Sequence, residues 1–401
     1  MGKKFYKLFI ANVISSAGDI IQDFAVMWYI LTRTENVGLA SLSLFLNYLP
    51  KIIFGPYAGV LADKKSKKSI IVLANLLNAA FCFGLVATVV MNLPVVYIMA
   101  ITFCMSSLDI FTMTADMSFI PEIVEEDNLM KANSMINGTN SAMGIAGPGL
   151  AGLLYGIFGA RGLFLINGIS FILASLIIFT ISYTFVKEED VEEERQTLKE
   201  KFQEYSSGFK VVQSNKNLMT FCIFGGGLIN FFIAQVSVYI SKYVLEQNIS
   251  QGVLFGLMTS SIAIGSLIAS VILSNVEVKN KKLVIINGFI LQGIFLFLFS
   301  KFNNYTYNLL ILILLGLASG VVGVNLNTYV QQIIPLETLG RSMSTIMLVA
   351  NIFVPLGILV AGFVGSKYHL SLITTVTGTC VTIIALYIAY RLKDTKNLEE
   401  A

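Results

Sequence analysis

The chain has 401 residues, of which 55% are hydrophobic and 13% are charged, with a formal net charge of +3. Its mean hydropathy is +0.76. Soluble domains carry roughly 25% charged residues, so this composition excludes a soluble protein and indicates a polytopic membrane protein. The charge is dispersed among many short segments, which gives no support for nucleic-acid binding.

Apolar stretches of the roughly 20 residues that a helix needs to cross a bilayer recur along the whole chain. We expect spans near residues 8–31, 38–62, 69–91, 94–118, 133–156, 162–185, 218–243, 252–274, 283–301, 306–332, 342–364 and 370–391. With twelve spans, both chain ends lie on one side of the membrane. Of the 27 Lys and Arg residues, 21 lie in segments that this topology places inside the cell, which predicts cytoplasmic N- and C-termini.

The predicted organisation is a six-helix bundle over 1–185, a linker over 186–217, a second six-helix bundle over 218–391 and a cytoplasmic tail over 392–401. The linker begins with an acidic run. Apolar residues then recur on one helix face, at Leu198, Phe202, Tyr205, Phe209 and Val212. This pattern predicts an amphipathic helix along the cytoplasmic surface. The helix either simply joins the two bundles or has a regulatory or partner-binding role.

The two halves also resemble each other weakly. Pro121 follows the fourth span and Pro335 follows the tenth, at an offset of 214 residues, and each is preceded by isoleucine. The lysines of 279–282 stand in the second half where those of 64–68 stand in the first. The pattern favours two matched halves.

The most specific motif lies at residues 55–68, where the second span ends. Gly55 and Gly59 are four residues apart and would share one helix face, which allows close helix packing. Asp63 would lie at the membrane surface and could accept hydrogen bonds from the free amides of a neighbouring helix N-terminus. The lysines Lys64, Lys65, Lys67 and Lys68 follow it.

This loop resembles the signature of the major facilitator superfamily. Further segments resemble a branch of drug exporters that includes macrolide efflux proteins and the enterobactin exporter: Ser16–Asp19, Tyr48–Gly55, Phe119–Ser134, Gly147–Gly152 and Leu339–Arg341. The resemblance implies an all-α membrane fold of twelve helices in two pseudo-symmetric bundles, with substrate bound near mid-membrane. It also implies that the chain is not an enzyme, and no nucleotide-binding loop or metal-ligand cluster is evident in the sequence.

Gly147, Pro148 and Gly152 resemble the end of a motif that antiporters carry in the fifth span, with Ala151 replacing one glycine. Pro148 lacks a backbone donor and can bend a helix. The small residues allow close packing on a neighbouring helix. The resemblance favours an exporter, and the structural alternative is a bent helix with no bearing on the direction of transport.

Ionisable side chains inside spans cost about 2.5–3.5 kcal/mol each on insertion scales, so they usually have a function. Asp19 and Asp23 are one turn apart in the first span, Lys51 lies in the second, and Asp109 and Asp116 are two turns apart in the fourth. The second half carries amides instead. The resemblance implies that the first, fourth, seventh and tenth spans line the cavity, which gives the candidate cavity residues Asp19, Asp23, Lys51, Asp109, Asn230, Gln235, Asn325 and Asn327.

Two interpretations of the acids are open. At least one of Asp19, Asp23 and Asp109 carries the coupling proton, because removal from water disfavours the charged form of a carboxyl group. Alternatively, Lys51 neutralises Asp19 or Asp23 as a fixed pair.

The sequence therefore predicts a monomeric, proton-coupled exporter of hydrophobic or amphipathic compounds, macrolide-like or multidrug, in the cytoplasmic membrane of a bacterium. It would work by alternating access, with the proton gradient as driving force and with no cofactor or metal. The alternatives are a lipid (lysophospholipid) or siderophore transporter of the same fold, and a membrane receptor that no longer transports.

Overall fold

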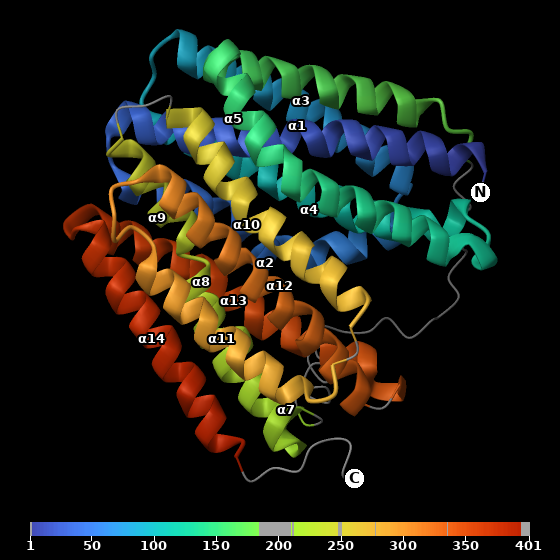
Figure 1. The fold of residues 1–401 in the computed structure, drawn as a ribbon. Helices are drawn as coiled ribbons and strands as arrows, with labels where there is room; N and C mark the ends of the chain where they lie inside the picture. Colours follow the sequence, from blue (N-terminus) through green and yellow to red (C-terminus); the bar gives the residue numbers. More distant parts are fainter. Residues whose placement is uncertain are drawn as a thin grey trace. The chain divides into compact units, whose positions relative to one another are not determined.

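The computed structural model describes residues 2–183, 210, 212–247, 251–276, 278–334 and 336–393. Within this part of the chain all regular structure is helical (Figure 1). The residues group into two compact units. The first is drawn from Met1–Glu189 and Gln247–Ser260, and the second from Asp190–Glu246 and Ser261–Ala401.

The first unit contains five helical elements and the first part of a further helix, α10 (Gln251–Ser274). The five are α1 (Lys3–Thr34), α2 (Val37–Lys64), α3 (Lys67–Val90), α4 (Val95–Ile123) and α5 (Glu126–Phe179). Asn36 and Ser66 cap the N-termini of α2 and α3, because their side chains accept hydrogen bonds from the first-turn amides of Leu39 and Ser69. Helices α1 and α3 pack along α5, and α2 and α3 pack along α4.

Helix α5 consists of two rods separated by one residue. Gly159 has a φ of 62° and a ψ of −177°, and it is the non-helical residue of the element. A side chain disfavours this backbone conformation, which explains glycine at the junction. The predicted spans 133–156 and 162–185 correspond to the two rods, although the second rod ends at Phe179.

The second unit begins with four short helical elements and continues with long helices. The short elements are α7 (Lys216–Thr220), η1 (Phe221–Ile229), α8 (Asn230–Ile233) and α9 (Val236–Leu245). The long helices are the later part of α10 (Gln251–Ser274), α11 (Lys281–Leu298), α12 (Tyr305–Ile333), α13 (Leu336–Lys367) and α14 (Leu370–Arg391). The predicted span 218–243 is therefore not one regular helix. Its η1 segment is a π-helix, a rare form that often marks functional sites. It contains the glycines Gly225, Gly226 and Gly227, whose backbone freedom permits unusual winding.

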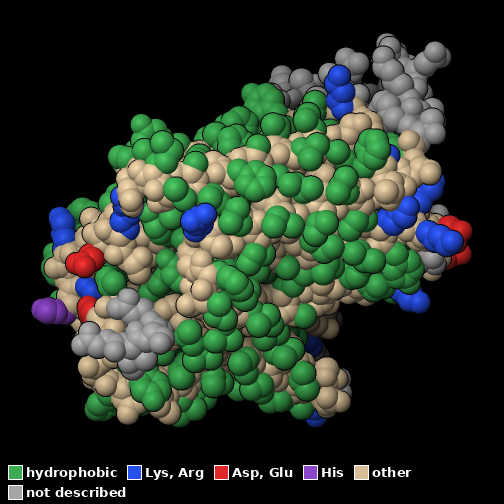
Figure 2. Space-filling model, turned by 90° about the horizontal axis from the view of Figure 1, so that it is seen from above, with side chains coloured by type: hydrophobic (Ala, Val, Ile, Leu, Met, Phe, Trp, Pro, Cys, Tyr) green, Lys and Arg blue, Asp and Glu red, His purple; other side chains and the backbone are tan. Residues whose placement is uncertain are grey.

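The surface has the character of a membrane protein. Nine helices in the described part of the chain are long and apolar enough to cross a bilayer. Helix α1 is not among them, because Asp19, Gln22 and Asp23 interrupt its apolar sequence. Figure 2 shows one face with broadly exposed hydrophobic side chains. The all-α membrane fold is confirmed, and the number of twelve spans stays a prediction.

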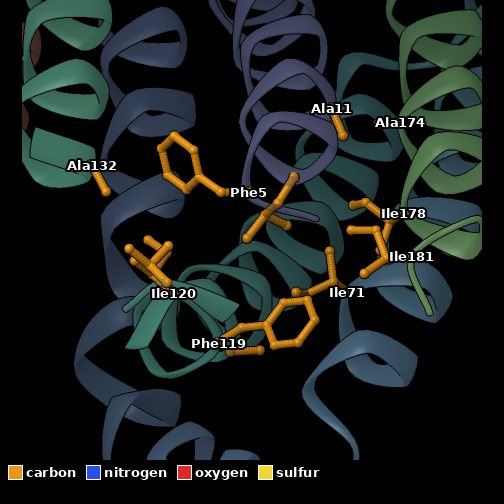
Figure 3. Close-up of a cluster of buried hydrophobic side chains, with 12 residues drawn as sticks. Phe5, Ala11, Ile71, Phe119, Ile120, Ala132, Ala174, Ile178 and Ile181 are labelled. Carbon is orange, nitrogen blue, oxygen red and sulfur yellow. The ribbon is translucent and has the colours of Figure 1, made fainter. Parts of the chain in front are cut away.

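A hydrophobic cluster joins the helices of the first unit near the start of α1 (Figure 3). It gathers Phe5 from α1, Ile71 from α3, Phe119 and Ile120 from α4 and Ile178 from α5, all buried. Ile120 also lines the cavity described below, so the cluster adjoins that cavity.

The predicted linker helix lies outside the described residues up to position 209. Val212, at its predicted end, is buried in the second unit against Leu218, Cys222 and Val330. The predicted tail lies outside the description from residue 394 onward.

Candidate functional site

A cavity of about 730 Å³ lies within the first unit, and residues from all five of its long helices line it. Most of the residues that line it have polar or charged side chains. It includes the acids Asp19, Asp23, Asp109 and Asp116, the lysine Lys51, and the amides Asn12, Gln22, Asn47, Asn75, Asn133, Asn137 and Asn140. Methionines Met105, Met113 and Met117 contribute apolar surface. The volume is in the usual range for small-molecule sites, about 300–1,000 Å³.

Helical spacing brings the acids together. On α1, Asn12, Ser16, Asp19 and Asp23 follow one another at intervals of three or four residues and therefore share one face. On α4, Asp109 and Asp116 are two turns apart on the face that also carries Thr102. The structure thus unites the predicted acids of both helices in one cavity.

Two of the acids are held by buried amides. Asn167 donates from Nδ2 to Asp19 Oδ1 at 3.3 Å, and Asn78 donates from Nδ2 to Asp109 Oδ1 at 2.8 Å. Both asparagines are almost completely buried, with 0% and 1% exposure. Since an ionised carboxylate only accepts hydrogen bonds, each amide presents its NH₂ group to the acid. The two acids are thereby fixed in position.

Gln22 connects this arrangement across four helices. Its Oε1 accepts from Asn167 Nδ2 at 3.0 Å and from Cys82 Sγ at 3.0 Å, and its Nε2 donates to Met105 Sδ at 3.3 Å. The Ser170 hydroxyl donates to Asn167 Oδ1 at 2.8 Å. The network links α1, α3, α4 and α5 around the base of Asp19.

The network depends on glycine at position 18 of α1. A Cβ atom there would lie 2.0 Å from Asn167 Oδ1 and 2.4 Å from Ser170 Oγ. Such distances are far below van der Waals contact, so only glycine lets α5 bring its amide to Asp19.

The remaining charged groups of the cavity, Asp23, Asp116 and Lys51, have no hydrogen bond to a buried amide in the part of the chain that the structure describes. Asp23 is exposed to the cavity, and Oδ1 of Asp116 has no hydrogen-bond partner among the described residues. Lys51 interacts electrostatically with Asp23 and Asp109, but within the described chain no ion pair joins it to any of the four acids. Its Nζ lies 5.5 Å from the centre of the Tyr48 ring. The alternative of a fixed Lys51–Asp pair is therefore not what the structure contains.

The candidate residues of the second half lie elsewhere. Gln235 is buried and accepts a hydrogen bond from the Tyr239 hydroxyl, which also bonds Thr377 Oγ1 at 3.0 Å. Asn325 donates from Nδ2 to the Val321 carbonyl of its own helix at 2.8 Å. Asn230 is half-buried and Asn327 is exposed. None of the four lines the cavity of the first unit.

Of the loop motif, Gly55 and Gly59 lie in α2, and the side chains of Asp63 and Lys64 lie outside the description. The later lysines hold the ends of neighbouring helices. Lys67 forms an ion pair with Glu122 at the end of α4. Lys68 donates from Nζ to the carbonyls of Phe179 and Ile181 at the end of α5, at 2.8 and 2.7 Å.

The hydroxyl of Tyr183 joins this end of the unit by donating to Glu122 Oε2 at 2.6 Å. Partial burial, followed by the hydrogen bond and the charge of Glu122, raises the pKa of Tyr183 to about 12. The tyrosine therefore stays a neutral donor throughout the physiological pH range.

The glycines of the antiporter-like motif permit close helix packing, as predicted from their size. A Cβ at Gly147 would lie 2.7 Å from Ile20 Cγ2 of α1, and one at Gly152 would lie 2.4 Å from the Gly252 carbonyl oxygen of α10. Pro148 stays within the helical part of α5, and the non-helical residue is Gly159. The role of this motif in the direction of transport stays a prediction.

Sequence reasoning missed the amides that surround the acids, namely Asn78, Asn167, Asn133, Asn137 and Asn140. The last three show a usable signal, because they recur at intervals of four and three residues within one stretch of α5. The first two are isolated, and only the packing of α3 and α5 reveals them.

Comparison with known proteins agrees with this architecture. The chain is 25% identical to macrolide efflux protein A of Streptococcus pyogenes over 391 residues, which cover 96% of this chain and 94% of that protein. Macrolide efflux protein A of Enterococcus faecalis is 30% identical over 184 residues, covering 45% of this chain and 55% of the relative. An uncharacterised transporter of the same superfamily, YvqJ of Bacillus subtilis, is 22% identical, with 96% and 90% covered.

Among solved structures, the nucleoside transporter NupG matches with a TM-score of 0.72 at 12% identity, covering 98% of this chain and 100% of that one. A bacterial homologue of the iron transporter ferroportin, in an inward-facing state, matches with a TM-score of 0.65 at 13% identity, covering 96% and 98%. The family model of the Major Facilitator Superfamily matches residues 8–358. The chain is therefore a membrane transporter, not an enzyme, and it belongs to the major facilitator superfamily.

Proposed function

We propose that the protein is a proton-coupled exporter of amphipathic organic cations, macrolide-like compounds among them. It works by alternating access in the cytoplasmic membrane of a bacterium, as a monomer with both termini inside. The efflux proteins among its relatives support the export of macrolides. The proton gradient drives the reaction, with no cofactor.

The observation that carries the proposal is the charge of the cavity. Four carboxyl groups, those of Asp19, Asp23, Asp109 and Asp116, face it, against the single ammonium group of Lys51. Such a site attracts cations, and a proton and a cationic substrate compete for the same carboxylates. Loading of substrate then releases a proton, which is the exchange that an antiporter requires.

The test uses purified full-length protein in liposomes with an imposed pH gradient. Asp23→Asn and Asp109→Asn are expected to abolish gradient-driven transport of a cationic macrolide. Substrate exchange without a gradient, which needs no net proton movement, is expected to persist in at least one of them.

Asp127→Asn provides the matched control. Asp127 is an exposed acid in the first turn of α5 that does not line the cavity. Its variant is expected to keep gradient-driven transport. Unchanged proton-driven transport in both cavity variants would refute the coupling role.

A second part of the proposal concerns the loop at the end of α2. Asp63 and the lysines after it lock and release the cytoplasmic gate, and the ion pair of Lys67 with Glu122 supports this role by fixing the start of α3 to the end of α4. Asp63→Asn is expected to leave the protein inserted in the membrane and to slow turnover at least tenfold. Normal efflux by that variant would contradict the gate.

A further inference from the structure

The cavity has a second polar surface, distinct from the acids. Asn133, Asn137 and Asn140 follow one another on one face of α5, and all three line the cavity. We name these three residues the amide stripe. Asn140 also borders a smaller cavity together with Asn12 and Ser16 of α1. The amide stripe therefore adjoins the polar face of α1 that carries Asp19 and Asp23.

The side-chain amides of the stripe are exposed and have no hydrogen-bond partner among the described residues. Asn78 and Asn167, in contrast, are buried and bonded to acids. The cavity thus contains two kinds of amide, one that positions carboxylates and one that faces the open space.

Open amides in a membrane-spanning helix require a polar environment, because an unsatisfied amide in hydrocarbon is costly. Each offers two N–H donors and one carbonyl acceptor. Hydroxyl, ether and carbonyl groups match such a surface, whereas purely hydrocarbon groups do not. The acids of α1 and α4 meanwhile suit an ammonium group.

We infer that the amide stripe binds the hydroxyl- and carbonyl-bearing body of a substrate whose cationic end meets the acids, so the substrate class is oxygen-rich organic cations such as aminated glycosides. This assignment rests on the proposed function and narrows it. Lipophilic cations without oxygen would bind through the acids alone and would not use the stripe.

The experiment compares two probes in liposomes that contain the full-length protein. Erythromycin is a cation with many hydroxyl and carbonyl groups, and tetraphenylphosphonium is a cation with none. Uptake of each labelled probe is measured by counterflow, and binding is measured in detergent by thermal shift. Asn133→Leu and Asn137→Leu are expected to reduce uptake and binding of erythromycin at least tenfold and to change those of tetraphenylphosphonium less than twofold.

Two further variants separate recognition from folding. Ser134→Leu introduces the same side chain at the neighbouring exposed position, which does not line the cavity, and is expected to leave both probes unaffected. Asn137→Gln retains an amide and is expected to recover a substantial part of the erythromycin binding that Asn137→Leu loses.

The outcomes distinguish the two proposals. Equal loss of both probes in the leucine variants, or no loss of erythromycin, would overturn the role of the stripe. A protein that transports tetraphenylphosphonium but neither binds nor transports erythromycin would overturn this inference and leave cation export standing. A protein that handles neither probe would overturn both.

Discussion

The two halves of the chain have similar contacts at the ends of their helices and different polar residues at their centres. Lys68 is the second residue of α3, and its ammonium donates to the carbonyls of Phe179, the last residue of α5, and of Ile181 just after it. Lys282, located 214 residues later, is the second residue of α11 and donates to the Leu392 carbonyl at the end of α14 at 2.9 Å. The N-cap residues Ser66 and Asn280 have the same offset.

At the centres the two units have little in common. In the first unit, acids and amides line a cavity, and Gln22 joins four helices around Asp19. In the second, Gln235 is packed against Tyr239, and Asn325 bonds its own helix. Contacts between a lysine and the end of another helix thus recur in both units, whereas the acids that line the described cavity belong to the first unit.

The largest effect is expected from Gly18→Val, which would destroy the polar centre of the first unit. The new side chain would occupy the place of the Asn167 amide and force α1 and α5 apart. We expect a loss of more than about 3 kcal/mol in the free energy of unfolding, the upper end for overpacking, and no proton-driven transport.

Thermal unfolding in detergent and transport in liposomes measure both effects. Gly84→Ala is the control, because a Cβ at Gly84 would lie at an ordinary distance of 3.5 Å from Ile101 Cδ1. If Gly18→Val were as stable as Gly84→Ala, the packing argument would be wrong.

The second prediction compares two buried glutamines. Gln22→Leu removes the acceptor of Cys82 and one of the two acceptors of Asn167. We therefore expect a destabilisation of about 1–3 kcal/mol and at least a tenfold loss of proton-driven transport. Gln235→Leu, in the second unit, is expected to destabilise the protein to a similar degree while coupling stays within twofold. Equal loss of proton coupling in both variants would show that the centres of the two units do not differ in function.

The third prediction tests the shared ends. Lys68→Met and Lys282→Met each remove a charged donor from helix-terminal carbonyls, and hydrogen bonds of charged groups contribute about 1.5–3 kcal/mol. Both are expected to lower the unfolding temperature, because each lysine donates to carbonyls at the end of another helix. Transport per folded molecule should remain in Lys282→Met, which lies outside the proposed gate. A stabilising effect of either substitution would show that the caps are dispensable.

The smallest effect is expected from Tyr183→Phe, which removes one hydrogen bond to Glu122, worth about 1 kcal/mol. The pKa of Tyr183 is raised to about 12 from 10.0, so the folded state favours the neutral hydroxyl. Its contribution is present in full below about pH 10 and is lost as the pH rises through about 12.

Unfolding curves of both proteins between about pH 6 and 9 should therefore differ by a constant amount. Proton-driven transport should keep the same pH profile. A difference in stability that varied within this range would indicate another titrating partner.

Much of this arrangement could be predicted from the sequence. The spacing of Asp19 and Asp23 places both on one face of α1, and the spacing of Asp109 and Asp116 does the same on α4, whatever the surroundings. The offset between Pro121 and Pro335 likewise predicts the register in which the lysine caps repeat. The placement of the acids depends only on helix geometry, and the register of the lysine caps depends only on the repeat in the sequence.

The rest depends on how helices pack against one another. Nothing in the sequence near Asn167 indicates that it reaches Asp19, which lies 148 residues earlier in the chain. Similarly, Gln235 lies in a span that the family resemblance places at the cavity, but it is buried and bonded to Tyr239, whose hydroxyl also bonds Thr377. Polar side chains in a bundle serve either packing or a cavity, and tertiary contacts decide between the two.

The π-helix η1 has a consequence for how this gene tolerates changes in length. A π turn holds one residue more than an α turn, so such segments behave as an insertion within an otherwise regular helix. Deleting a single codon among Gly225, Gly226 and Gly227 would let the segment rewind as an ordinary α-helix and would keep Asn230 and Gln235 facing their present neighbours. The same deletion in α3 or α12 would rotate every following side chain by about 100°. Relatives that are one residue shorter in this span therefore remain compatible with the fold.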